Sequence, residues 1–87
     1  MTRPRLITGA RLMYDEVRQE HMLLLPEAAA RLNPSAAAVL ELCDGVRSLD
    51  EIVGAVSARY DGADVRDDVE GLVEAMLQRG LVTDAGA

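Results

Sequence analysis

Two helix starts in the middle of the chain decide the fold class. Residues 33–53 read NPSAAAVLELCDGVRSLDEIV. Asn33 can cap a helix whose first position is Pro34, because proline has no N–H group that would need a partner there. Ser48 and Glu51 have the spacing of a capping box, in which each side chain bonds the other residue's backbone N–H. The stretch therefore predicts two helices in succession.

The apolar residues of both predicted helices repeat at helical spacing, so each helix has one face for a core. The first face consists of Ala36, Val39, Leu40 and Cys43, and the second of Leu49, Ile52, Val53, Val56 and Tyr60. Gly45 is expected to end the first helix in the left-handed conformation, and Asp61-Gly62 to end the second. Cys43 is interpreted as a small core residue.

A third helix is predicted between Asp64 and Gly80. Asp64 is expected to cap it, and Asp67 and Asp68 lie in its first turn, where the helix dipole favours negative charge. Its apolar arc consists of Val65, Val69, Leu72, Val73, Met76 and Leu77. At about 100° per residue the arc spans roughly 140°, somewhat more than the ~100° stripe of a surface helix. The helix is therefore either well buried or leaves one edge of the arc for a partner.

The residues before Asn33 favour short strands. Residues 11–15 alternate, residues 22–25 form a second apolar run, and the polar residues between them fit a hairpin connection. His21 is expected to face solvent, and Pro26 ends the second run because it cannot donate to a ladder. A small sheet followed by three helices is the outline of a winged-helix-like α+β domain, which DNA-binding and peptide-binding proteins share.

Residues 27–32, which read EAAARL, are ambiguous. Alanine, glutamate, leucine and arginine are strong helix formers, so propensity favours a helix. Only about seven residues separate Pro26 from the stop at Asn33-Pro34, however, and an isolated helix of that length is marginal. Local rules leave both conformations open.

The composition restricts the function. With 87 residues we expect one domain, residues 1–87, and the net charge of −6 and the absence of Trp and Phe disfavour a nucleic acid as partner. Such a charge also disfavours an anionic membrane surface. The single cysteine excludes an internal disulfide, and the longest apolar run, residues 22–25, is too short to span a bilayer. We therefore expect a cytoplasmic location.

The sequence offers no catalytic or metal-binding constellation. Its one histidine and one cysteine have no supporting motif, and no zinc-ligand spacing, dinucleotide motif or P-loop is present. The four aspartates between residues 61 and 68 lack the spacing of an EF-hand loop, and helix capping explains most of them. We therefore expect no enzyme, no cofactor and no bound metal.

The chain resembles the PqqD family, the small proteins of the pyrroloquinoline quinone (PQQ) pathway. The resemblance covers about residues 3–82. It is carried by Arg3-Pro4-Arg5-Leu6, Leu24-Leu25-Pro26-Glu27, Arg31-Leu32-Asn33, Leu42-Cys43-Asp44-Gly45-Val46-Arg47-Ser48, Glu51-Ile52-Val53, Val65, Asp68-Val69, Leu72 and Gly80-Leu81-Val82. The Leu-Cys-Asp-Gly turn at a fixed distance after the Pro-Glu and Leu-Asn signals is the most specific part.

The resemblance implies a fold and a function. The family's fold is a small N-terminal antiparallel three-stranded sheet followed by three helices, which makes residues 28–32 the third strand against their helix propensity. The family is a non-catalytic recognition element for ribosomally made, post-translationally modified peptides (RiPPs). It acts as a peptide chaperone that binds the precursor peptide PqqA and presents it to the radical S-adenosylmethionine enzyme PqqE, which crosslinks a Glu and a Tyr of the peptide.

The resemblance also implies a peptide-binding site in a groove between the third strand and the third helix. An extended peptide can add to an exposed strand edge, where backbone bonds supply affinity and side-chain pockets supply selectivity. Mapped onto this sequence, the strand contributes Ala28, Ala29, Ala30, Arg31 and Leu32, and the helix contributes Val65, Asp68, Val69, Leu72 and Met76.

Three alternatives stay open from the residues themselves. A recognition domain of another peptide-modification pathway would have much the same outline. An acidic winged-helix regulator would fit the fold, although its helices would have few cations for phosphates. An oligomerisation module would use the strand edge to pair with a second copy, so the chain is expected to be a monomer or a weak homodimer through that edge.

Overall fold

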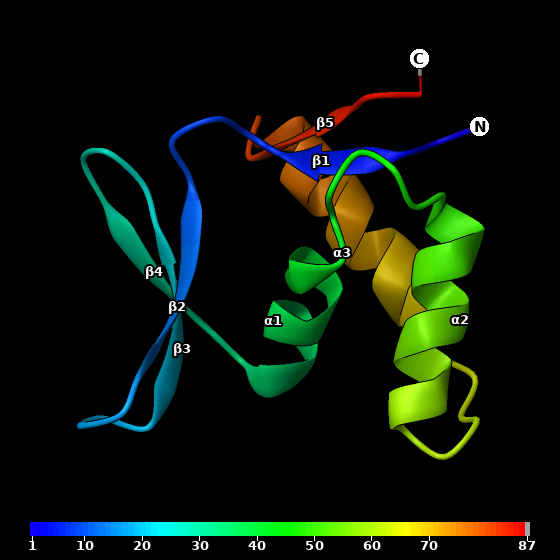
Figure 1. Cartoon of the computed structure of the whole chain (residues 1–87), viewed down its shortest axis with the longest axis horizontal. Helices are drawn as coiled ribbons and strands as arrows, with labels where there is room; N and C mark the ends of the chain where they lie inside the picture. Colours follow the sequence, from blue (N-terminus) through cyan, green and yellow to red (C-terminus); the bar gives the residue numbers. More distant parts are fainter. Residues whose placement is uncertain (87) are drawn as a thin grey trace.

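The computed structural model describes residues 1–86, which form two small sheets and three helices (Figure 1). The elements in chain order are β1 (Pro4–Leu6), β2 (Arg11–Asp15), β3 (Glu20–Leu24), β4 (Ala29–Leu32), α1 (Pro34–Glu41), α2 (Leu49–Arg59), α3 (Arg66–Gln78) and β5 (Val82–Asp84). The predicted α+β fold, with a three-stranded antiparallel sheet before three helices, is confirmed.

The three-stranded sheet has the order β2-β3-β4, with both pairs antiparallel. The predicted hairpin is confirmed, although β3 begins at Glu20, earlier than the apolar run indicated. The ambiguous segment is a strand from Ala29 to Leu32, because β3 supplies a ladder along its whole length and outweighs a helix propensity of a few tenths of a kcal/mol per residue. Ala28 lies just before the strand, in the turn, where its carbonyl accepts the Leu25 N–H at 2.8 Å.

A second sheet pairs the two ends of the chain and was not predicted. β1 and β5 are antiparallel, with Pro4 opposite Asp84 and Leu6 opposite Val82. The Arg3 N–H also donates to Oδ1 of Asp84 at 3.0 Å. Each strand has only three residues, too few for a period-2 pattern to be recognised. The pairing fixes the segment that follows α3 against the segment that precedes β2.

The predicted starts of the first two helices are confirmed. Oδ1 of Asn33 accepts the Ala36 N–H at 2.7 Å, with Pro34 at the first helical position. The capping box of α2 is complete, because Ser48 Oγ accepts the Glu51 N–H at 3.2 Å and Glu51 Oε1 accepts the Ser48 N–H at 2.9 Å. Both helices then direct their apolar faces into one core with α3.

Two predicted caps were wrong. α1 ends at Glu41, so Gly45 lies beyond the helix; it has the expected positive φ of 79°, but its N–H donates to the Pro4 carbonyl at 2.9 Å. A side chain at this position would meet the Arg5 side chain, so the glycine lets the loop approach β1. The cap position of α3 is occupied by Val65, which makes no side-chain bond. Asp64 instead accepts the Arg66 N–H at 3.3 Å, two residues on, as in an Asx turn.

The end of α3 is as predicted. Gly80 has a φ of 72°, its N–H donates to the Leu77 carbonyl, and the Leu81 N–H donates to the Met76 carbonyl. These two bonds form a Schellman motif, which satisfies carbonyls that the helix end would otherwise leave without donors. The motif turns the chain back so that Val82, 1% exposed, enters the core at the start of β5.

Three carboxylates near the β1–β5 sheet are held in their charged form. Backbone N–H groups lower the pKa of each: those of Arg47 and Val46 at Asp44, that of Ser48 at Glu51, and those of Arg3 and Gly86 at Asp84. A folded-state pKa below the unfolded value means stabilisation that is present above the unfolded pKa, about 4, and is lost as pH falls toward the folded pKa.

The urea midpoint of unfolding is therefore expected to be constant above about pH 5 and to fall between about pH 5 and 3. Equilibrium urea titrations at several pH values measure it. Glu51→Gln keeps an acceptor for the Ser48 N–H but has no charge to lose, so its curve should fall less steeply over the same range. A midpoint that stays constant down to pH 3 would contradict this account.

Candidate functional site

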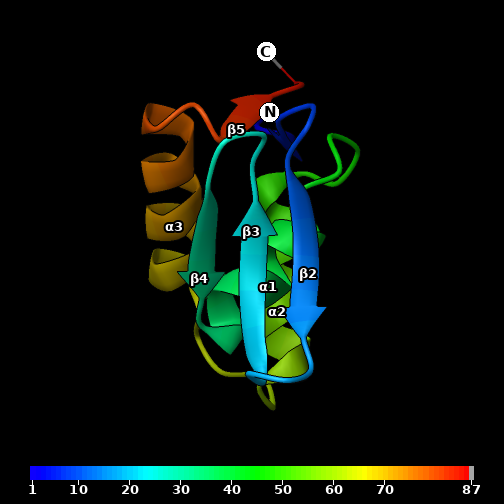
Figure 2. The ribbon, with the colours of Figure 1, turned by 90° about the vertical axis from the view of Figure 1, so that its left-hand side faces the viewer.

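One long edge of the three-stranded sheet is free. Within residues 1–86, β4 pairs with no strand other than β3, and Figure 2 shows it at the end of the sheet beside α3. Ala29, Ala30 and Arg31 are exposed, and Leu32 is half-buried against the core. The edge therefore presents backbone groups flanked mostly by small side chains, which allow another chain to approach closely.

The register shows which backbone groups face outward. The Leu25 N–H bonds to the Ala28 carbonyl across the β3–β4 turn. In an antiparallel ladder, residues alternate between bonding toward one neighbour and toward the other. Counting back from this bond, every second residue of β4 bonds to β3, and the N–H and C=O groups of Ala29 and Arg31 face the free edge.

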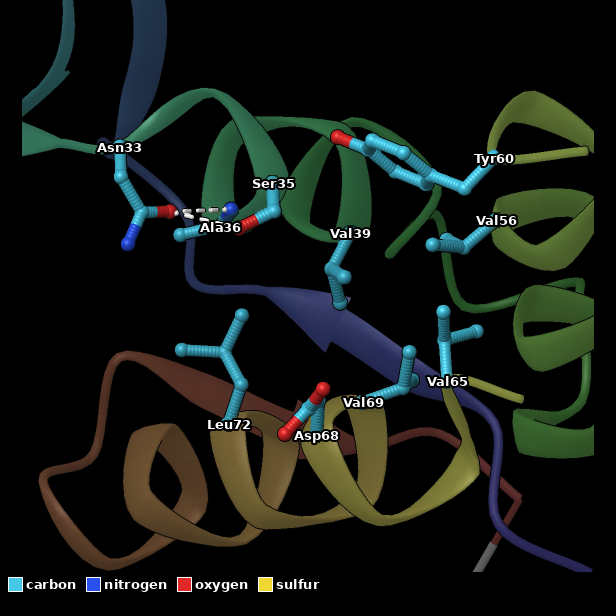
Figure 3. A pocket seen from close by; sticks show the side chains of 10 residues that line it. All are labelled: Asn33, Ser35, Ala36, Val39, Val56, Tyr60, Val65, Asp68, Val69 and Leu72. Atoms are coloured by element: carbon cyan, nitrogen blue, oxygen red, sulfur yellow. Dashed lines mark hydrogen bonds between the residues drawn. The ribbon is translucent and has the colours of Figure 1, made fainter. Parts of the chain in front are cut away.

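A hollow of about 280 Å³ lies near this edge, between α1, α3 and the end of α2 (Figure 3). It is lined by Asn33, Ser35, Ala36, Val39, Val56, Tyr60, Val65, Asp68, Val69 and Leu72. In Figure 3 the side chains of Leu72 and Val69 rise from α3 toward Ala36 and Val39 of α1. The floor is aliphatic, so it can take an apolar side chain in a place that excludes most of the water around it.

Polar groups surround the mouth of the hollow. The Asn33 carbonyl oxygen is already used, since it accepts the Ala36 N–H and the Ser35 hydroxyl at 2.9 Å. The Asp68 carboxylate is exposed, and among residues 1–86 it makes no ion pair. Tyr60 is 42% exposed at the opposite side. The hollow therefore combines an apolar floor with one negative charge at its mouth.

The structure divides the ten site residues expected from the resemblance. Val65, Asp68, Val69 and Leu72 line the hollow. Ala29, Ala30, Arg31 and Leu32 form β4, whereas Ala28 lies in the preceding turn. Met76 is 8% exposed and belongs to the core beneath.

Sequence reasoning missed the residues that α1 and α2 contribute to the hollow. They are Asn33, Ser35, Ala36, Val39, Val56 and Tyr60. Asn33 had a complete local explanation as a helix cap, and Ala36, Val39 and Val56 were taken as ordinary core positions. The exposed ring of Tyr60, at the end of an otherwise aliphatic helix face, was the one signal that could have indicated an opening there.

The two candidate catalytic side chains are separate and inert. Cys43 is buried as predicted, and burial, followed by the nearby Asp44 charge, raises the pKa of its thiol to about 11. His21 was expected to face solvent but is half-buried, because its ring meets the edge of the Tyr14 ring at a centroid distance of 4.8 Å. No set of three or more His, Cys, Asp or Glu side chains in the described chain could hold a metal ion.

The helices of residues 1–86 also bear on membranes: none combines the length and apolar content needed to cross a bilayer. The longest, α3, has 13 residues and several acidic side chains.

The comparisons with known proteins agree with this geometry. The family model of PqqD, described as coenzyme PQQ synthesis protein D, matches residues 20–82. The chain belongs to the PqqD family. The PqqA binding protein of Methylococcus capsulatus (strain Bath) is 36% identical over 74 residues, which cover 85% of this chain and 80% of that protein. The PqqA binding protein of Rhodopseudomonas palustris (strain TIE-1) is 36% identical over 86 residues, covering 97% and 84%.

A solved structure extends the PqqD match to the fold. The solution structure of the PqqD truncation of Methylobacterium extorquens PqqCD has a TM-score of 0.73 and 34% identity, with 92% of this chain and 87% of that one covered. That truncation is described as a functional, stand-alone RiPP recognition element. The resemblance read from the sequence is therefore confirmed for the PqqD family and its fold.

Proposed function

We propose that this chain binds the precursor peptide PqqA as a strand added to β4 and presents it to the radical S-adenosylmethionine enzyme PqqE in pyrroloquinoline quinone biosynthesis. The observation that carries the proposal is the free edge of β4 next to an apolar hollow lined by α1 and α3. The identity of the peptide is supported by the PqqD relatives that are named PqqA binding proteins.

In this mechanism the peptide bonds to the outward N–H and C=O groups of Ala29 and Arg31. Val65, Val69 and Leu72 form the apolar wall on the helix side, and Asp68 favours a basic or neutral peptide segment. Each backbone bond contributes about 0.5–1.5 kcal/mol net, whereas ordering the peptide costs about 2–5 kcal/mol. An apolar peptide side chain buried in the hollow adds about 1.5–3 kcal/mol. Edge and hollow are therefore both needed.

Presentation follows from the small size of the site. A strand of four residues and a hollow of about 280 Å³ hold a short segment of a peptide and only a few of its side chains. The remaining residues stay outside the groove and are free to enter the active site of another protein. We propose that this exposed part is what PqqE receives, while the PqqD-like chain itself performs no chemistry.

A proline at position 31 tests strand addition. The Arg31 N–H faces the free edge, so Arg31→Pro removes a donor to the peptide without removing a β3–β4 bond. We expect PqqA affinity, measured by calorimetric titration, to fall about tenfold or more, because one bond is lost and the ring obstructs the incoming strand.

Arg31→Ala is the matched control. It removes the same 74% exposed side chain and its 3.7 Å ion pair with Glu20 but keeps the N–H, so affinity should stay within about threefold of the unmodified chain. Equal losses in the two variants would show that the side chain matters and the edge does not. Circular dichroism confirms that both variants keep the fold.

A further inference from the structure

The opposite edge of the sheet, along β2, is also free. Figure 2 shows β2 at the far end from β4, and the described residues give it no strand partner except β3. Met13 and Tyr14 in its middle are 45% and 49% exposed, which is high for large apolar side chains. A shallow hollow lined by Arg11, Leu12, Met13 and Leu24 lies beside the strand. A free edge with exposed apolar side chains is open to pairing.

The sequence of β2, Arg11-Leu12-Met13-Tyr14-Asp15, is complementary to itself when two copies run antiparallel. With Met13 opposite Met13 of a second copy, Leu12 lies opposite Tyr14, and Arg11 lies opposite Asp15. A two-fold axis repeats each pair, so the interface has two opposite-charge pairs and two aromatic–aliphatic pairs.

The backbone alternation fits the same register. Since the Leu25 N–H faces β4, the Leu24 backbone faces β2 and bonds to its partner Arg11, and Met13 and Asp15 follow at every second position. The N–H and C=O groups of Leu12 and Tyr14 then face the free edge. In the two-fold pairing these two residues bond each other across the axis. Arg11 and Asp15 form the non-hydrogen-bonded pairs, in which side chains come closest.

The β4 edge lacks this complementarity. Its only charged residue is Arg31, so antiparallel self-pairing would place arginine opposite alanine, leucine or arginine. Like charges opposite one another are unfavourable. A second copy of the chain is therefore better matched to β2, and a peptide client is left with β4.

We propose that two copies of this chain associate along β2 about a two-fold axis at Met13. The association joins the three strands of each copy into one continuous sheet. The two β4 edges then lie at opposite ends of that sheet, so each copy keeps its own peptide site. This inference concerns a different edge from the proposed PqqA site and does not depend on it.

Charge reversal at the two ends of β2 tests the register. Sedimentation equilibrium is run on the whole chain over a wide concentration range. Arg11→Glu places two acidic pairs across the axis and should raise the dimer dissociation constant about tenfold or more. Asp15→Lys places two basic pairs there and should do the same. An equimolar mixture of the two variants restores opposite charges at both ends and should form a heterodimer with the affinity of the unmodified chain.

Two further variants guard the interpretation. Oδ1 of Asp15 also accepts the Val17 and Arg18 N–H groups of the hairpin turn, and Asp15→Asn keeps that acceptor while removing the charge, so it should still weaken the dimer. Arg79→Glu makes the same change in net charge far from β2 and should leave dimerisation unchanged.

The inference is overturned by a chain that stays monomeric at millimolar concentration, or by folded Arg11→Glu and Asp15→Lys chains that do not associate when mixed. It is also overturned by a dimer that PqqA dissociates, because the copies would then be using the β4 edge.

Discussion

A Leu72→Asp variant is expected to bind PqqA about 100-fold or more weakly while keeping its fold. Leu72 is half-buried on α3 and lines the hollow beside β4. Its replacement removes an apolar contact worth about 1.5–3 kcal/mol and places a second carboxylate one turn from Asp68, in a site that would be desolvated by the peptide. Calorimetric titration with PqqA measures the loss, and circular dichroism and urea unfolding measure the fold.

Leu77→Asp is the matched control for this experiment. Leu77 is also a half-buried leucine on α3 that packs against the core, but it does not line the hollow. Both substitutions should lower the urea midpoint, and only the change at position 72 should abolish binding. If Leu72→Asp unfolds the chain, Leu72→Ala tests the same contact more gently. Unchanged affinity in a folded variant would remove the hollow from the proposed site.

A Leu40→Ala variant is expected to lose about 2–5 kcal/mol of a total stability of about 4–13 kcal/mol for a chain of this length. Leu40 is 1% exposed on α1, the helix that packs against the sheet on one side and belongs to the helix core on the other. Truncation leaves a cavity that neighbours on two sides cannot both fill. Thermal unfolding should shift downward by roughly 10–30 °C, since about 4–8 °C corresponds to 1 kcal/mol in a domain of this size.

Leu40→Met serves as the control, because it conserves volume and should cost less than about 1.5 kcal/mol. Similar losses in the two variants would show that the site tolerates no change of shape, and that cavity formation is not the cause. A loss below 1 kcal/mol for Leu40→Ala would contradict the placement of α1 at the centre of the core.

Features that depend on contacts within a few residues could be predicted from the sequence. The Asn33 cap, the Ser48–Glu51 capping box and the Gly80 helix end each rest on bonds that close within one turn. The apolar faces of the three helices depend only on a period of 3.6 residues, and their buried members form the core as expected. The fold class and the burial of Cys43 followed from these local rules.

Features that depend on distant partners were decided by the tertiary structure alone. β1 and β5 exist because residues about 80 positions apart meet, and neither three-residue segment has a pattern of its own. Residues 29–32 are a strand because β3 offers a ladder, although their own propensity favours a helix. The hollow needs side chains from α1, α2 and α3 together, so no single stretch could reveal Asn33 or Tyr60 as its lining. Propensity and capping energies are local, whereas the shape of a groove is set by how separate elements pack, and that information is spread over the whole chain.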